Sequence, residues 1–217
     1  TSATRLLVMS FMIALVGIMG GNGVFAAANT QTINSAVTAF QTISTLRREF
    51  PIDGEAIAAT YAGDLQALVQ EIDETNGLEL NNDLQTAIND IKNDSEPVLA
   101  AQVIDKTLQR VFYQIIWNRI SAIRDEFETA TSAALTPMLD EAQASFEAIK
   151  GTVARENQVL TADRQAIEAG SNPGLDTQIN ESFSRVRTAL KKSNPAEDFS
   201  VVQVERYGIR ISLARAY

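Results

Sequence analysis

PVLAAQVIDKTLQRVFYQIIWNRISAIRDEFE, residues 97–128, is the stretch that decides the fold of this chain. Its apolar side chains recur every three or four residues, at Ile104, Leu108, Val111, Ile115, Ile116, Ile120, Ile123 and Phe127. Phe112, Tyr113 and Trp117 widen this stripe, which is typical of a helix covered on several sides. At 1.5 Å per residue such a helix would be about 48 Å long. The segment therefore predicts one long helix at the centre of a helical bundle.

Helical periodicity also covers most of the chain on either side of this segment. We expect helices over residues 30–49, 54–74, 79–93, 137–158, 174–192 and 197–217, and strand-like alternation is absent over any useful length. A proline costs little at the first helical position, and all five prolines lie near expected helix starts: Pro51, Pro97, Pro137, Pro173 and Pro195. We expect none inside a helix. The prediction is an all-α protein with an antiparallel bundle of about seven helices.

Two self-matches suggest an internal duplication. Residues 43–50 (ISTLRREF) resemble residues 120–127 (ISAIRDEF), and residues 104–111 (IDKTLQRV) resemble residues 204–211 (VERYGIRI) in charge and apolar pattern. Together they predict two four-helix units, residues 29–116 and 117–217, that share the long central helix. The alternative is chance similarity between amphipathic helices of like composition.

The second match aligns two pairs of cations. Lys106 and Arg110, and likewise Arg206 and Arg210, are spaced four residues apart and so share one face of their helix. They are candidates for two equivalent anion sites. The alternative is that they form interhelical ion pairs, because a buried arginine is usually paired.

The N-terminal region, residues 1–28, contains a hydrophobic segment. Residues 6–28 carry no charge and would span about 35 Å as a helix, which is enough to cross a bilayer. Arg5 before this segment and the acidic body after it place the N-terminus in the cytoplasm or stroma and the body in the periplasm or thylakoid lumen. We expect a retained transmembrane anchor. A signal peptide, cleaved after the small residues near Ala26 or Ala28, is the alternative.

Gly17 and Gly21 form a small-residue pair within this segment. Glycines four residues apart allow a second helix to approach closely in a membrane. We therefore interpret them as a candidate helix-packing site for another membrane subunit.

Charge and composition exclude several classes of function. The formal charge is −9, the first acid is Glu49, and no run of Lys and Arg exceeds two residues. This distribution argues against a nucleic-acid partner. The chain has no Cys and no His, which rules out thiolate and imidazole metal ligands and imidazole bases. No nucleophile elbow, phosphate loop or calcium loop is present, so we expect no enzyme activity, no cofactor and no metal.

Two functions remain as hypotheses. The first is a non-catalytic accessory or scaffold subunit, anchored by residues 6–28, whose acidic body packs on the periplasmic or lumenal face of a respiratory or photosynthetic membrane complex. The alternative is an exported helical ligand-binding or sensor protein with a cleaved signal peptide.

Overall fold

The computed structural model describes residues 30–164 and 174–216 of the chain. These residues form eight helices and no strand, which confirms the all-α prediction. The helices are α1 (Thr30–Leu46), α2 (Gly54–Tyr61), α3 (Asp64–Asn76), α4 (Leu80–Lys92), α5 (Pro97–Glu126), α6 (Ser132–Arg164), α7 (Leu175–Ala189) and α8 (Pro195–Ala216).

The expected helix over residues 54–74 was wrong, because two helices occupy this region. α2 ends at Tyr61 and α3 begins at Asp64. Between them Gly63 adopts φ +102°, a left-handed conformation that a residue with a Cβ rarely adopts. The glycine therefore ends one helix and lets the next begin at a new angle, which raises the count from seven to eight within the described residues.

The expectation that no proline lies inside a helix was also wrong. α6 begins at Ser132 rather than at Pro137, so Pro137 falls in its second turn. The earlier start is stabilised by Thr131, whose carbonyl accepts bonds from the Ala134 and Leu135 N–H groups at 3.0 and 3.1 Å. Its hydroxyl also accepts from the Ala134 N–H at 3.3 Å. Near the start of a helix, one missing N–H leaves the remaining ladder intact.

Other predicted helix starts are confirmed. Pro97 and Pro195 are the first residues of α5 and α8. Asp53 caps α2, because its Oδ1 accepts a hydrogen bond from the Ala56 N–H at 2.9 Å. The Asp198 carboxylate likewise accepts from the Asn194 N–H just before α8, at 2.9 Å. Local chemistry of this kind depends little on the rest of the fold.

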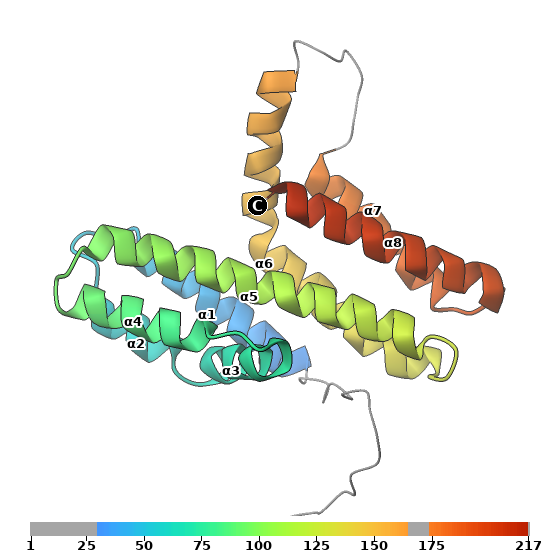
Figure 1. Cartoon of the computed structure of the whole chain (residues 1–217), viewed down its shortest axis with the longest axis horizontal. Helices are drawn as coiled ribbons and strands as arrows, with labels where there is room; N and C mark the ends of the chain where they lie inside the picture. Colours follow the sequence, from blue (N-terminus) through green and yellow to red (C-terminus); the bar gives the residue numbers. More distant parts are fainter. Residues whose placement is uncertain (1–29, 165–173, 217) are drawn as a thin grey trace, which may run out of the picture.

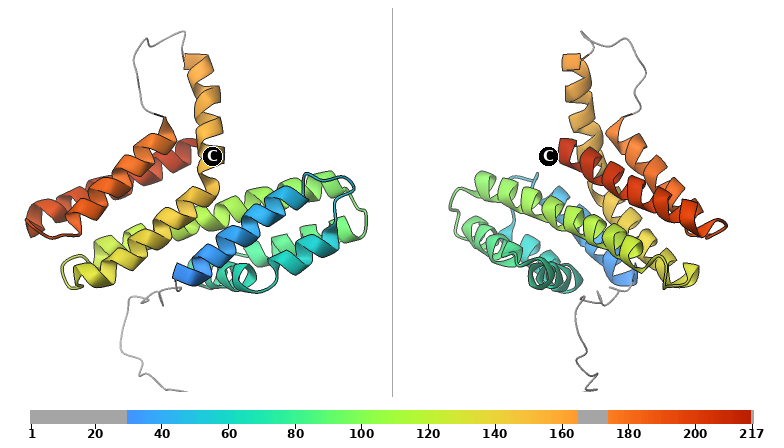
Figure 2. Two further views of the ribbon diagram at one scale, coloured as in Figure 1. Left: turned by 180° about the vertical axis from the view of Figure 1, so that it is seen from behind. Right: turned by 45° about the vertical axis from the view of Figure 1, so that its right-hand side comes forward.

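The helices are arranged around α5, which is 30 residues long and extends along most of the body (Figure 1). α4, α6 and α8 pack against α5, and α1 packs against α3 and α6. α7 and α8 form an antiparallel hairpin on the other half of the molecule from α2 and α4. Figure 2 shows α1 on the reverse side of α5.

One continuous core joins these elements. The apolar stripe of α5 is fully buried from Ile104 to Ile123. Three aromatic pairs tie other segments to the core: Phe40 with Phe112 at 5.2 Å between ring centroids, Phe127 with Phe199 at 5.8 Å, and Phe146 with Phe183 at 5.8 Å. Paired rings at these distances stabilise a core beyond their burial alone.

The expected membrane segment lies outside the described residues, and so do Gly17 and Gly21. Within residues 30–164 and 174–216, no helix is both long enough and apolar enough to cross a bilayer.

Candidate functional site

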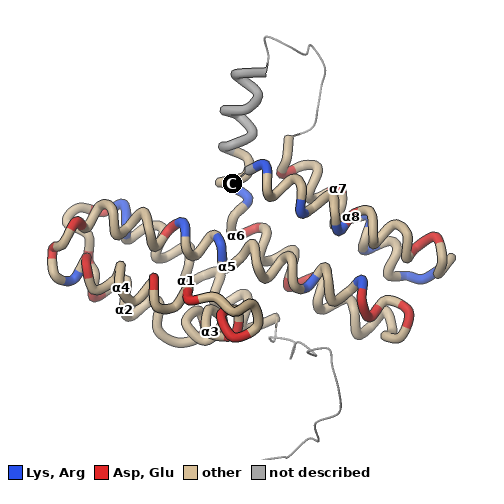
Figure 3. Tube along the Cα trace, viewed as in Figure 1, with Lys and Arg blue, Asp and Glu red and all other residues tan. Residues whose placement is uncertain are grey.

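The four matched cations gather where α8 crosses α5, along a surface that we call the α5–α8 seam. It consists of Lys106, Gln109, Arg110, Tyr113, Gln114, Trp117 and Ser121 on α5, and of Arg206, Arg210 and Ala214 on α8. Arg206 forms a hydrogen bond with Ser121, Arg210 stacks on Trp117, and Ala214 lines the same cavity as Arg110. α8 therefore runs antiparallel to α5, and its C-terminal turn reaches the middle of the long helix. Blue segments recur along both helices in Figure 3.

Trp117 holds two of the cations. The guanidinium carbons of Arg206 and Arg210 each lie 4.7 Å from the centroid of its rings. Arg206 also lies 4.7 Å from the Tyr207 ring and donates a hydrogen bond to Ser121 Oγ at 3.2 Å. Stacking of guanidinium on indole stabilises the charge without a carboxylate. This pair therefore fastens α8 to α5.

Lys106 and Arg110 line a cavity of about 370 Å³ between α5 and the end of α8, together with Gln109, Tyr113, Gln114 and Ala214. Both cations are exposed, and neither has a carboxylate within 4.0 Å in the described part of the chain. Gln109 is only 2% exposed, and its Oε1 has no hydrogen-bond donor among the described residues. The cavity thus brings two cations without an ion-pair partner among the described residues together with the buried side chain of Gln109, which also borders another cavity beside Arg47 and Asp105.

The acids next to the matched cations are paired elsewhere. Asp105 accepts from Arg47 at 2.9 Å, and Glu205 accepts from Arg185 at 2.5 Å. Among the described residues, none of the four matched cations forms an ion pair. The interhelical ion-pair alternative thus finds no partner there, and the anion-site hypothesis stays a prediction.

A buried ion pair, which the sequence analysis missed, joins α5 to α6. Arg119 Nε donates to Glu141 Oε2 at 2.6 Å, and the side chains are 5% and 1% exposed. Glu71 on α3 lies 3.7 Å from the same guanidinium. Burial raises the pKa of Glu141 above its ordinary value, although the charge of Arg119 opposes this shift. Closed to solvent on all sides, the pair contributes to architecture rather than to a binding site.

The Asn-rich connection between α3 and α4 is held by Asp73. Its two carboxylate oxygens accept from the Leu80 and Asn81 N–H groups, each at 2.8 Å. The Tyr61 hydroxyl donates to Asn81 Oδ1 at 2.9 Å, and burial, with the nearby Asp73 charge, raises the pKa of Tyr61. These bonds explain the cluster as a cap of α4.

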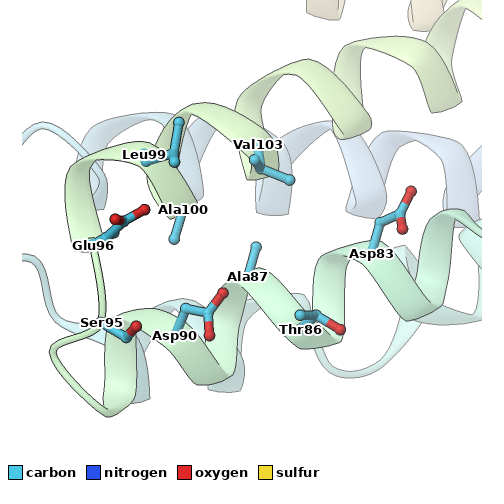
Figure 4. A pocket seen from close by; sticks show the side chains of 9 residues that line it. All are labelled: Asp83, Thr86, Ala87, Asp90, Ser95, Glu96, Leu99, Ala100 and Val103. Carbon is cyan, nitrogen blue, oxygen red and sulfur yellow. The ribbon is translucent and has the colours of Figure 1, made fainter.

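A second cavity, of about 250 Å³, lies between α4 and α5 and has an acidic rim (Figure 4). Asp83 and Asp90 of α4 point toward it, and Glu96 lies at its end beside the exposed side chain of Leu99. Within the described ranges no three carboxylates come close enough together to hold a metal ion.

Comparison of the chain with known protein families, with curated proteins and with solved structures finds no match in any of the three. What the seam can do is therefore argued from its own side chains: it offers two unneutralised cations, a buried acceptor and an aromatic wall.

Proposed function

We propose that this chain is a non-catalytic accessory or scaffold subunit, anchored by residues 6–28, whose acidic helical body packs on the periplasmic or lumenal face of a larger membrane complex. One observation carries the proposal: the outer face of α8 bears three uncovered apolar side chains. Val204 is 67% exposed, Tyr207 49% and Ile211 51%. Their spacing puts them on one stripe of the helix.

The surroundings of this α8 stripe indicate the chemistry of its partner. Arg210 and Arg215 are exposed on the same helix, while the chain as a whole carries a charge of −9. An apolar patch with charged edges is typical of a protein interface. We expect a subunit that presents an apolar helical face flanked by Asp or Glu.

The cavity of about 370 Å³ at the α5–α8 seam favours a second candidate. In this alternative the chain is an exported helical ligand-binding or sensor protein whose signal peptide is removed. Mature protein that begins at Ala27 or Asn29 would favour it over the anchored subunit.

The test is co-migration of the full-length chain with a detergent-solubilised complex from its native membranes. Ile211→Glu places a carboxylate on the α8 stripe, where we expect a partner to bury it without a counter-ion, so this variant should run free in a native gel. Phe50→Glu is the matched control, because Phe50 is 87% exposed and lies far from α8 in sequence. It should migrate with the complex as the wild type does.

Circular dichroism of both variants checks that the fold is retained. The proposal fails if Ile211→Glu remains in the complex, or if the wild-type chain runs as a free monomer.

A further inference from the structure

We propose that the cavity between α5 and the C-terminal turn of α8 binds a small organic acid. Its carboxylate would lie between Lys106 and Arg110, and its apolar body against Tyr113 and Ala214. An N–H or O–H of the ligand would donate to Gln109 Oε1. This inference goes beyond the proposed docking of α8 and does not depend on it.

The charge of the cavity is the first argument. Acids outnumber bases by 27 to 18 in this chain, yet no acid of the described residues neutralises Lys106 or Arg110. Two like charges four residues apart on a helix destabilise it, and an anion bridging them removes that repulsion. Lysine and arginine side chains also donate strong charge-assisted hydrogen bonds to a carboxylate.

The unused acceptor of Gln109 is the second argument. This side chain is 98% buried, and its Oε1 lacks a donor among the described residues. A buried acceptor without a partner costs roughly 1–3 kcal/mol, and few such groups persist in native proteins without an explanation. Gln109 lines the cavity that holds the two cations, and it also borders another cavity beside Arg47 and Asp105. The proposed ligand donates to it from the side of the two cations.

The size and walls of the cavity define the ligand class. A volume of about 370 Å³ lies within the range of small-molecule sites. Tyr113 is half-buried and presents an aromatic ring, and Ala214 presents a methyl group. A simple inorganic anion would pair with the cations but would leave Tyr113 and Ala214 exposed to water. The site therefore fits an organic acid with an apolar body and one hydrogen-bond donor.

N-acetyl-leucine is a suitable probe, because it carries a carboxylate, an isobutyl group and an amide N–H. N-acetyl-leucinamide lacks the charge, 4-methylpentanoate lacks the donor, and inorganic phosphate lacks the apolar body. Binding of each to the full-length chain is measured by isothermal titration calorimetry, with the fluorescence of Trp117, the single tryptophan, as a second signal. We expect saturable binding of N-acetyl-leucine, weaker binding of 4-methylpentanoate and of phosphate, and none of the amide.

Variants tie this binding to the cavity. Arg110→Gln and Lys106→Gln should each weaken binding of N-acetyl-leucine about tenfold, which corresponds to one charge-assisted hydrogen bond. Gln109→Leu should weaken binding of N-acetyl-leucine but not of 4-methylpentanoate, since only the former has a donor. Lys191→Gln removes an exposed cation between α7 and α8 and should change nothing.

Several results would overturn the proposal. They are the absence of saturable binding by both acids, affinities unchanged in Arg110→Gln and Lys106→Gln, or an equal loss in Lys191→Gln. Phosphate binding as tight as that of N-acetyl-leucine would overturn the assignment to an organic acid. Thermal melts of each variant confirm that the fold is intact, so a loss of binding is attributable to the cavity.

Discussion

The α4–α5 and α7–α8 hairpins begin their second helix in the same way but cover it differently. Proline is the first residue of both α5 and α8, and residues 104–111 match residues 204–211 in pattern. In α5 the matched positions Ile104 and Val111 are 1% and 0% exposed, whereas in α8 Val204 and Ile211 are 67% and 51% exposed. Equivalent sequence thus gives a core helix in one half and a partly open helix in the other.

The neighbours of each helix explain the difference. α5 is packed by α4, α6 and α8, and Phe112 adds a contact with Phe40 of α1. α8 packs against α7, α5 and α6, and it buries Val202, Ile209 and Leu213. α8 is therefore apolar on two faces, and a helix of that kind is usually buried all round. This contrast is what makes a missing partner for α8 a physical inference.

The ion pairs of the two halves also differ in burial. Arg119 and Glu141 are both buried between α5 and α6, while Arg185 in the α7–α8 hairpin is half exposed. Substitutions in the two halves should therefore have very different effects on stability.

The largest effect is expected at the buried pair. Glu141→Ala leaves the Arg119 guanidinium buried, with only the longer 3.7 Å contact to Glu71. Breaking one side of a buried pair typically costs about 4 kcal/mol of unfolding free energy. Urea unfolding of the full-length chain measures it. Replacing both partners, with Arg119→Met and Glu141→Leu, should cost less than Glu141→Ala alone, and a larger loss in the double variant would contradict this account.

Glu141 also determines the direction in which the unfolding free energy changes with pH. Because burial raises the pKa of Glu141, the folded state binds this proton more tightly than the unfolded chain does. The contribution of Glu141 to stability is therefore complete below its ordinary pKa of 4.5 and is lost as the pH rises through the higher pKa of the folded state. Glu141→Gln should flatten this part of the profile of unfolding free energy against pH. A profile unchanged by the substitution would show that other groups cause it.

The parts of the fold that were predictable from sequence depend on local chemistry. Pro97 and Pro195 mark helix starts through a fixed φ, whatever the rest of the chain does. Gly63 was missed because a glycine inside a periodic segment is often tolerated, and only its positive φ shows the break. The expected start of α6 at Pro137 was wrong, because Thr131 starts the helix one turn earlier.

The candidate site was predictable only in part, for a related reason. Self-similarity identified the cation pairs, Lys106 with Arg110 and Arg206 with Arg210. It did not show that Trp117 holds one pair while Gln109 and Tyr113 line a cavity with the other. Those roles depend on where α8 crosses α5, which is a tertiary property. Arg119 was overlooked because a single cation within an apolar stripe does not identify its distant partner.

The next largest change in unfolding free energy is expected between the matched segments, residues 104–111 of α5 and residues 204–211 of α8. Ile104→Ala opens a cavity in a packed core and should cost about 3 kcal/mol of unfolding free energy. Val204→Ala removes a side chain that is 67% exposed and should change it by about 0.5 kcal/mol or less. Urea unfolding of the two variants, with the same detergent and protein concentration, gives the comparison. Equal losses would mean that α8 is covered in solution, for example by a second copy of the chain.

The smallest effect is expected at the Arg185–Glu205 pair, whose arginine is half exposed. Arg185 donates to Glu205 at 2.5 Å, but its side chain is 50% exposed, so solvent screens the interaction. Arg185→Gln should lower the unfolding free energy by about 0.5 kcal/mol, and the loss should shrink further in high salt. Lys150→Gln, at the exposed pair with Glu147 on α6, is the matched control and should behave alike. A loss at Arg185 as large as that of Glu141→Ala would show that the α7–α8 hairpin is as closed as the α5 core. In that case the open face of α8 could not be explained by sparse neighbours.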